Sequence, residues 1–163
     1  MKILLLSDTH SYIDERILHY ATTVDEIWHA GDIGSLEVTD ALQNIKPLVA
    51  VYGNIDDHLA RAVFKKDEIF EREGVKIFMT HIGANPGRYT ATLKKKLQTI
   101  KPQLFVCGHS HIAKVQYDAS MQCLYANPGA VGIYGHHKVR TMFRFEINQG
   151  KIENFEVIEL GIK

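Results

Sequence analysis

The sequence predicts an α/β protein in which a mostly parallel N-terminal sheet packs against a second sheet of mixed or antiparallel strands. Three observations support this fold class: several short apolar runs, helical patterns between these runs, and a change to hairpins after Ala113. Short, continuously apolar runs are typical of strands that are buried on both faces of a parallel sheet. Helices that alternate with such strands indicate a layered α/β architecture.

Five apolar runs are predicted to be strands, and each leads into glycine or into polar residues. The runs are Ile3–Leu6, Ile27–Trp28, Leu48–Tyr52, Val75–Met79 and Leu104–Cys107. In open parallel sheets, ligands bind beyond the carboxyl ends of the strands. We therefore expect the polar residues that follow these runs to meet at one edge of one sheet.

Helical patterns lie between the apolar runs. Apolar residues recur at helical spacing in Asp14–Ala21, Leu36–Ile45 and Thr90–Ile100. Because they alternate with strands, these segments are expected to cover the parallel sheet.

After Ala113 the pattern changes to short strands joined by small polar turns. Such pairs are typical of antiparallel hairpins, and they are Lys114–Tyr117 with Met121–Tyr125 and Thr141–Ile147 with Ile152–Leu160. We expect them to form the second sheet, packed on the first, so that residues 1–163 make one domain.

Composition excludes several classes of function. The 163 residues carry 19 acidic and 19 basic side chains, so no general positive field favours a nucleic-acid partner. The N-terminal apolar stretch is shorter than the ~7 residues of a signal-peptide core, and no stretch approaches the ~18 apolar residues of a membrane span. Cys107 and Cys123 are too few for a disulfide framework. We expect a cytoplasmic protein without a membrane partner.

The polar residues after the strands have the chemistry of metal ligands. Asp8 and His10 are two residues apart, so an extended segment projects both side chains to one side. Asp32 can bridge two cations, because each of its carboxylate oxygens can bind one. The candidate metal ligands are seven: Asp8, His10, Asp32, Asn54, His81, His109 and His111.

This ligand set predicts a centre of two metal ions. Seven ligands exceed the needs of one tetrahedral ion and suit two ions about 3.5–4 Å apart, as in two-metal hydrolysis. Imidazole and carboxylate donors without thiolate favour Mn²⁺, Fe, Zn or Ni over Ca or Mg. We take Mn²⁺ as the first expectation for both ions.

The order of the motifs closely resembles that of the calcineurin-like metallophosphoesterase superfamily. The matching elements are Asp8-Thr9-His10, Gly31-Asp32, Gly53-Asn54, Thr80-His81 and Gly108-His109-Ser110-His111. The short length, Gly53-Asn54-Ile55-Asp56 and Asn127-Pro128-Gly129 look most like the small bacterial and archaeal phosphodiesterase branch. The resemblance covers nearly the whole chain and implies a four-layer α/β/β/α sandwich.

The resemblance also implies roles for the candidate ligands. One ion would be held by Asp8, His10, Asp32 and His111, and the other by Asp32, Asn54, His81 and His109. A hydroxide bridging the ions would attack a small phosphodiester substrate, because bound cations lower the pKa of water. We expect Asp32, Asn54 and His109 to take part most directly in catalysis.

One position departs from the family pattern. Many superfamily phosphatases carry a histidine directly after the Gly-Asn pair, where it can protonate the leaving oxygen, whereas this chain has Ile55. General acid catalysis is worth about 10²–10⁴-fold, so isoleucine favours substrates whose leaving group departs easily. His58 is a possible substitute donor, and we expect it to be dispensable for an activated ester.

Other residues near the motifs have a structural and a functional interpretation. Arg88 could reach a substrate phosphate and Tyr89 could stack on an aromatic leaving group, although the simpler interpretation is a loop before the next helix. We expect His29 to orient metal ligands rather than bind metal. His136 and His137 are interpreted as solvated loop residues, with substrate contact as the alternative.

Two other functions remain open from the sequence. The chain could be a phosphomonoesterase or a dinucleotide polyphosphate hydrolase, although Ile55 argues against monoesters with poor leaving groups. It could also be a non-catalytic protein-binding scaffold of the same fold, but the complete set of ligand types argues against that. Exposed strands in the second sheet also leave a homodimer open.

Overall fold

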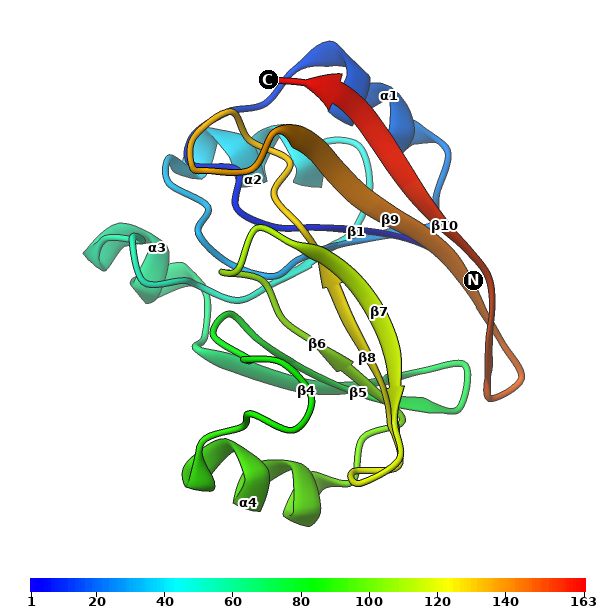
Figure 1. The fold of residues 1–163 in the computed structure, drawn as a ribbon. Helices are drawn as coiled ribbons and strands as arrows, with labels where there is room; N and C mark the ends of the chain where they lie inside the picture. Colours follow the sequence, from blue (N-terminus) through cyan, green and yellow to red (C-terminus); the bar gives the residue numbers. More distant parts are fainter.

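The computed structural model describes all 163 residues and arranges them in four layers. Two helices, α1 (Glu15–Thr22) and α2 (Leu36–Gln43), cover the outer face of one five-stranded sheet. A second five-stranded sheet packs on the inner face of the first, and α4 (Ala91–Ile100) covers its far side (Figure 1). This arrangement confirms the predicted α/β/β/α sandwich.

The first sheet is parallel in its centre and antiparallel at one side. Its strand order is β10-β9-β1-β2-β3. β1 pairs in parallel with β2, and β2 with β3, whereas β9 runs antiparallel to both β1 and β10. The bounds are β1 Lys2–Leu6, β2 Glu26–His29, β3 Leu48–Ala50, β9 Val139–Asn148 and β10 Lys151–Ile162.

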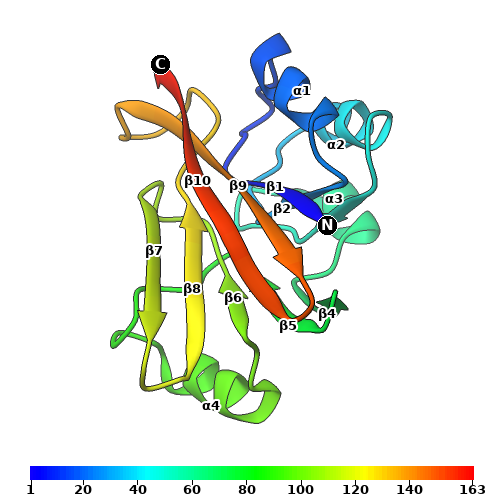
Figure 2. The same cartoon turned by 90° about the vertical axis from the view of Figure 1, so that its right-hand side faces the viewer.

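The second sheet is mixed. Its order is β4-β5-β6-β8-β7, with β5, β6 and β8 parallel and β4 and β7 antiparallel to their neighbours. In Figure 2, β6, β8 and β7 run side by side below the β9–β10 hairpin. The bounds are β4 Asp67–Arg72, β5 Val75–Thr80, β6 Leu104–Val106, β7 Ala113–Asp118 and β8 Cys123–Pro128.

The expectation that all five apolar runs belong to one sheet was wrong. The first three are β1, β2 and β3 of the first sheet, whereas the last two are β5 and β6 of the second. After β3, at the edge of the first sheet, the chain passes through α3 (His58–Val63) into the other layer. The predicted hairpins also divide between the sheets, since β7–β8 joins the second and β9–β10 the first.

Three hydrophobic cores lie between the four layers, and β1 contributes to two of them. Ile3 and Leu5 face the core between the sheets, while Leu4 and Leu6 face the core beneath α1 and α2. This division follows from the alternation of side chains along a strand. Burying each such side chain stabilises the fold by about 1.5–3 kcal/mol, so the end of β1, where Asp8 follows, is held from both sides.

Two elements were not predicted from the sequence. The helix α3 has only six residues and is capped by Asp57, whose carboxylate accepts from the amides of Leu59 and Ala60. The strand β4 is half-exposed and pairs with β5 at the sheet edge.

No helix combines the length and the apolar character that crossing a membrane requires. The homodimer stays a prediction.

Candidate metal centre

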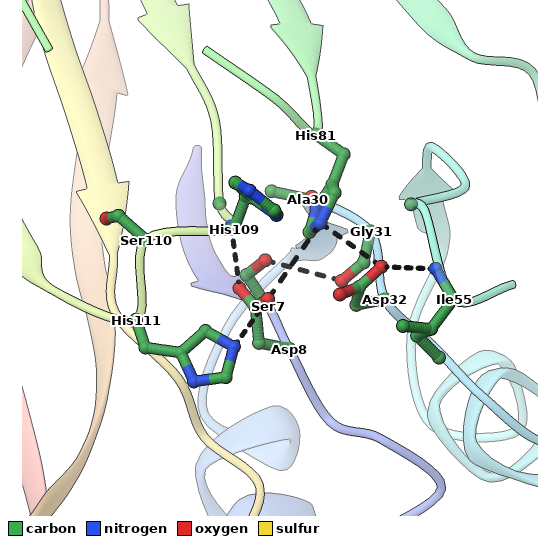
Figure 3. A network of polar contacts seen from close by, with 12 residues as sticks. Ser7, Asp8, Ala30, Gly31, Asp32, Ile55, His81, His109, Ser110 and His111 are labelled. Carbon is green, nitrogen blue, oxygen red and sulfur yellow. Dashed lines mark hydrogen bonds and ion pairs between the residues drawn. The ribbon is translucent and has the colours of Figure 1, made fainter. Parts of the chain in front are cut away.

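The seven candidate ligands converge although they follow five strands of two sheets. Asp8 and His10 follow β1, Asp32 follows β2 and Asn54 follows β3. From the second sheet, His81 follows β5, and His109 and His111 follow β6 (Figure 3). Two groups have ligand atoms within 4.8 Å of one another: Asp8 with His10 and His111, and Asp32 with His81 and His109.

The loops that carry these residues have an unusual backbone conformation. Positive φ angles occur at Asp8 (56°), His10 (47°), Asp32 (55°), His109 (68°) and His111 (58°). Non-glycine residues rarely adopt this region, at a cost on the order of 1–3 kcal/mol each, and such residues cluster at functional sites. The fold therefore maintains five strained residues where the candidate ligands meet.

Two glycines allow the loops to approach one another. Gly31 has a φ of +95°, and a Cβ atom added there would lie 2.7 Å from Nδ1 of His81. A Cβ atom on Gly53 would collide with the carboxylate and backbone of Asp32. Any larger residue at either position would displace a candidate ligand, so close approach requires glycine at both, and at Gly31 the positive φ requires it as well.

The carboxylate of Asp32 lies between the two groups. Its Oδ1 atom is 3.1 Å from Nε2 of His81 and also accepts a 3.1 Å hydrogen bond from the amide of Ile55. Its Oδ2 atom is 3.7 Å from Nε2 of His10. One oxygen thus faces each group, an arrangement that suits a carboxylate shared by two cations.

Three buried polar atoms in the centre have no hydrogen-bond partner: Asp8 Oδ1, His10 Nε2 and His81 Nε2. His111 Nε2 comes within 3.1 Å of Asp8 Oδ1, but these atoms also lack hydrogen-bond geometry. An unsatisfied buried polar group costs about 1–3 kcal/mol. Divalent cations would coordinate all three atoms, so this donor set fits the metal ions that the sequence predicts.

His81 is oriented so that one ring nitrogen faces the centre. Its Nδ1–H donates a 2.8 Å hydrogen bond to the carbonyl of Ala30, which directs Nε2 towards Asp32. Burial opposes the charged ring, but Asp32 and Asp8 outweigh it and raise the pKa of His81 in the metal-free protein. Because a cation binds only the neutral ring, metal affinity should fall as the pH falls.

His111 is held by a second histidine, His137. The Nε2–H of His137 donates to the carbonyl of Gly132 at 3.0 Å, which leaves its Nδ1 to accept from Nδ1–H of His111 at 3.2 Å. This chain of hydrogen bonds leaves Nε2 of His111 free to face Asp8. The interpretation of His137 as a solvated loop residue was wrong, because its ring contacts His111 in the loop that follows β6.

His29 connects the loops that carry Asp8 and Asp32. Its Nδ1 accepts from the amide of Gly31 at 3.1 Å, so its Nε2–H donates to Oγ1 of Thr9 at 2.9 Å. Thr9 in turn donates to the carbonyl of Ile33. Complete burial lowers the pKa of His29 to about 4, so the ring is neutral near pH 7. These contacts agree with the expectation that His29 orients ligands.

The buried carboxylate of Asp56 was not singled out in the sequence and has a similar role. It accepts hydrogen bonds from the backbone amides of Gly53 at 2.7 Å, Ile33 at 3.1 Å and Gly34 at 2.7 Å. It therefore ties the Asp32 loop to the Asn54 loop. The sequence could have revealed this role through the position of Asp56, two residues after Asn54. A carboxylate beside tight turns readily accepts hydrogen bonds from their backbone amides.

Two cavities meet at Asn54, one on each side of the centre. The larger measures about 790 Å³ and includes His10, Asp32, His109 and His111 in its wall. The smaller measures about 440 Å³ and includes His81. A substrate bound at the centre would therefore have space on both sides.

Neither His58 nor Arg88 lines either cavity, so the structure does not bring these two predicted substrate-binding residues to the centre. His58 is exposed at the first position of α3, and Arg88 is exposed in the loop before α4. The hydroxyl of Tyr89 donates to Asp118, and its ring packs on Phe105, so it is not placed to stack on a substrate.

The chain belongs to the calcineurin-like phosphoesterase superfamily. The sequence model of the Calcineurin-like phosphoesterase superfamily domain matches residues 1–150. A probable metallophosphoesterase of Mycoplasma pneumoniae is 30% identical over 164 residues, covering 94% of each chain. These matches confirm the family that the motif order indicates and support a metal-dependent phosphoesterase.

Solved structures support the fold. Vps29 of Entamoeba histolytica in complex with Zn²⁺ is 18% identical, with a TM-score of 0.74 over 98% of this chain and 99% of that one. A Streptococcus pneumoniae protein described as a predicted phosphoesterase is 20% identical, with a TM-score of 0.69 over 97% of each chain. At these identities the likeness concerns the fold alone.

Proposed function

We propose that the protein is a dinuclear metal-dependent phosphodiesterase that hydrolyses a small phosphodiester. The first ion would be held by Asp8, His10, Asp32 and His111, and the second by Asp32, Asn54, His81 and His109. The observation that carries this proposal is the set of three buried ligand atoms without a partner. The position of Asp32, with one oxygen towards each group, supports two ions rather than one.

The protein side of the mechanism follows from burial and exposure. When bound, the two ions would supply an activated water and positive charge for the phosphate oxygens. Asp8 and Asp32 are buried and would fix the ions, whereas Asn54 and His109 are the exposed members of the set. Because Asn54 lines both cavities and His109 lines the larger one, these two residues lie where a substrate would enter.

Ile55 supports a diester with a good leaving group. Its side chain is 45% exposed and lines the larger cavity, and its amide hydrogen bonds to Asp32. It therefore occupies a position beside the centre without offering a proton. Since a general acid contributes about 10²–10⁴-fold, substrates that need protonation of the leaving group should be hydrolysed slowly.

Mixed oxygen and nitrogen donors support Mn²⁺ as the metal, with Fe, Zn or Ni as alternatives.

The experiment compares two chromogenic esters with and without metal. Protein reconstituted with Mn²⁺ should hydrolyse bis(p-nitrophenyl) phosphate faster than p-nitrophenyl phosphate, and elemental analysis should find two ions per chain. Faster hydrolysis of the monoester would favour a phosphomonoesterase. Full metal content without turnover of either ester would favour the protein-binding scaffold, and a protein that retains no metal would refute the proposal.

A further inference from the structure

We propose that the smaller cavity, here called the basic cavity, binds a second anionic group of the substrate, a phosphate or a carboxylate. Its cationic side chains are Arg61, Lys66 and Lys96. The substrate would thus be a phosphodiester with an additional negative charge on one arm. This inference rests on the proposed function for the reacting ester, but the binding of the second anion is tested separately.

The basic cavity adjoins the candidate metal centre. Gly53, Asn54 and His81 belong to its wall, and Lys66 and Lys96 come from other elements. Arg61 belongs to α3, Lys66 precedes β4, and Lys96 belongs to α4. In Figure 1, β4 and β5 lie between these two helices. A ligand that reaches the centre through Asn54 can therefore extend into the cavity.

Positive charge exceeds negative charge in the wall of this cavity. Its three cationic side chains face a single carboxylate, that of Asp67, which pairs with Lys96. Lys66 is exposed and takes part in no ion pair. Arg61 donates to the backbone carbonyls of Asp56 and Asn54, so its guanidinium is held beside the centre. A charge without a partner at a cavity wall attracts an anion.

Hydrogen-bond donors accompany this charge. The side chains of Thr80, Thr90 and Thr92 line the cavity, and each hydroxyl can donate. Thr90 is also the N-cap of α4, so the first turn of this ten-residue helix lies at the wall. The N-terminus of a helix carries a partial positive charge that favours anions. Charge and donors therefore coincide in one concave space.

The larger cavity lacks this excess of positive charge, because its wall contains one lysine, Lys163, and one carboxylate, that of Asp32. Exposed apolar side chains contribute to its wall, and these are Ile55, Ile112, Ile133 and Tyr134. It also meets the basic cavity at Asn54. This difference in charge favours a substrate with unlike arms: an anionic arm in the basic cavity and an uncharged arm, which the exposed apolar side chains can contact, in the larger one.

Neighbouring lysines provide matched controls. Lys65 precedes Lys66 directly but pairs with Glu68 and does not line the cavity. Lys95 precedes Lys96 on α4 and is exposed outside it. Replacing Lys66 and Lys96 changes the net charge by as much as replacing Lys65 and Lys95. A difference between the two variants therefore reports binding in the cavity rather than general electrostatic attraction.

The experiment measures binding rather than turnover. Calorimetry on the Mn²⁺-loaded protein compares butyl phosphate with the bisphosphates of ethanediol, butanediol and hexanediol, which place a second phosphate at increasing distance. At least one bisphosphate should bind about tenfold more tightly than butyl phosphate, a factor typical of one well-placed charge pair. The Lys66→Ala/Lys96→Ala variant should lose this difference, whereas Lys65→Ala/Lys95→Ala should keep it.

Two results would overturn the inference. One is equal affinity of the wild-type protein for butyl phosphate and all three bisphosphates. The other is an equal loss in the Lys65→Ala/Lys95→Ala variant, with circular dichroism showing that both variants are folded. Because the measurement requires no hydrolysis, an inactive protein that still prefers a bisphosphate would refute the phosphodiesterase but retain the anion site.

Discussion

The two sheets contribute different chemistry to the candidate metal centre. The first sheet supplies both carboxylates, the amide of Asn54 and one imidazole, whereas the second supplies only the imidazoles of His81, His109 and His111. Two contacts between ligand side chains, His81 with Asp32 and His111 with Asp8, cross from one sheet to the other at 3.1 Å. Neither sheet carries a complete ligand set. The centre therefore depends on the core that packs the sheets together.

The sheets also differ in how firmly they hold their ligands. On the first sheet, His29 and Asp56 are buried and tie three ligand-bearing loops together. On the second sheet, His111 depends on a partly exposed histidine, and the ring of His109 is exposed. We infer that the first sheet, together with the buried His81, provides the rigid part of the centre, and that the loop of His109 and His111 provides the adaptable part. Substitutions in the first sheet should consequently have the larger effects.

The largest effect is expected for Asp32→Ala. Because Asp32 faces both groups, its loss should remove both ions and lower kcat/KM by more than about a hundredfold, beyond the 10–100-fold typical of residues that only support a ligand. Metal content and hydrolysis of bis(p-nitrophenyl) phosphate measure this. The exposed Asp40→Asn on α2 serves as the control. Unchanged rates in Asp32→Ala would remove the basis of the proposal.

The second-largest effect is expected for His29→Ala. This substitution breaks the connection between the Asp8 and Asp32 loops without touching either ligand. Metal affinity should fall by about 10–100-fold, which a metal titration measures directly. The exposed His19→Ala on α1 should leave affinity unchanged. Wild-type affinity in His29→Ala would show that the first sheet does not need this connection.

A smaller loss is expected for His137→Ala. Nδ1 of His111 would lose its hydrogen-bond acceptor. Because His137 is only partly buried, a water molecule can take the place of its ring. Metal affinity should fall about tenfold, the lower limit for a residue that orients a ligand. A loss greater than that of His29→Ala would reverse the inferred difference in rigidity between the two parts of the centre.

The buried His29 also predicts a pH dependence of stability. Its pKa is about 4 in the folded protein and 6.5 in the unfolded chain, so only the unfolded chain binds this proton between those values. The free energy of unfolding of the metal-free protein should therefore fall as the pH drops from 6.5 towards 4, by about 1.4 kcal/mol per pH unit from this residue.

Chemical denaturation at several pH values measures this dependence. His29→Gln should reduce its slope, while His19→Gln should not. His10 and His137, whose pKa values burial also lowers, contribute in both proteins and cancel from the comparison. An identical slope in the wild type and His29→Gln would indicate that His29 is protonated in the folded protein.

The smallest effect is expected for His58→Ala. His58 is exposed at the start of α3 and lines neither cavity. Surface substitutions of this kind change energies by about 0.5 kcal/mol or less, which corresponds to roughly a twofold change in kcat on bis(p-nitrophenyl) phosphate. A hundredfold loss would identify His58 as a proton donor and would place α3 closer to the substrate than in this structure.

The sequence alone was sufficient to predict every strand except β4, three of the four helices and the set of candidate ligands. Continuous apolar runs such as Ile3–Leu6 reveal buried strands, because a strand covered on both faces needs apolar residues throughout. The ligand chemistry was also visible, since Asp8, His10 and Asp32 directly follow such runs. The apolar runs and the polar residues that follow them are short stretches of consecutive residues, so both can be recognised in a single sequence. The helix α3 was missed because six residues are too few to show a period.

Only the tertiary structure decided how these pieces combine. The division of the five strands between two sheets depends on where the chain crosses from one layer to the other, and no local pattern records that crossing. The support of His111 by His137 and the grouping of Lys96 with Arg61 and Lys66 join residues that are distant in sequence. Such contacts arise from the packing of whole layers, which depends on all the side chains of the cores at once.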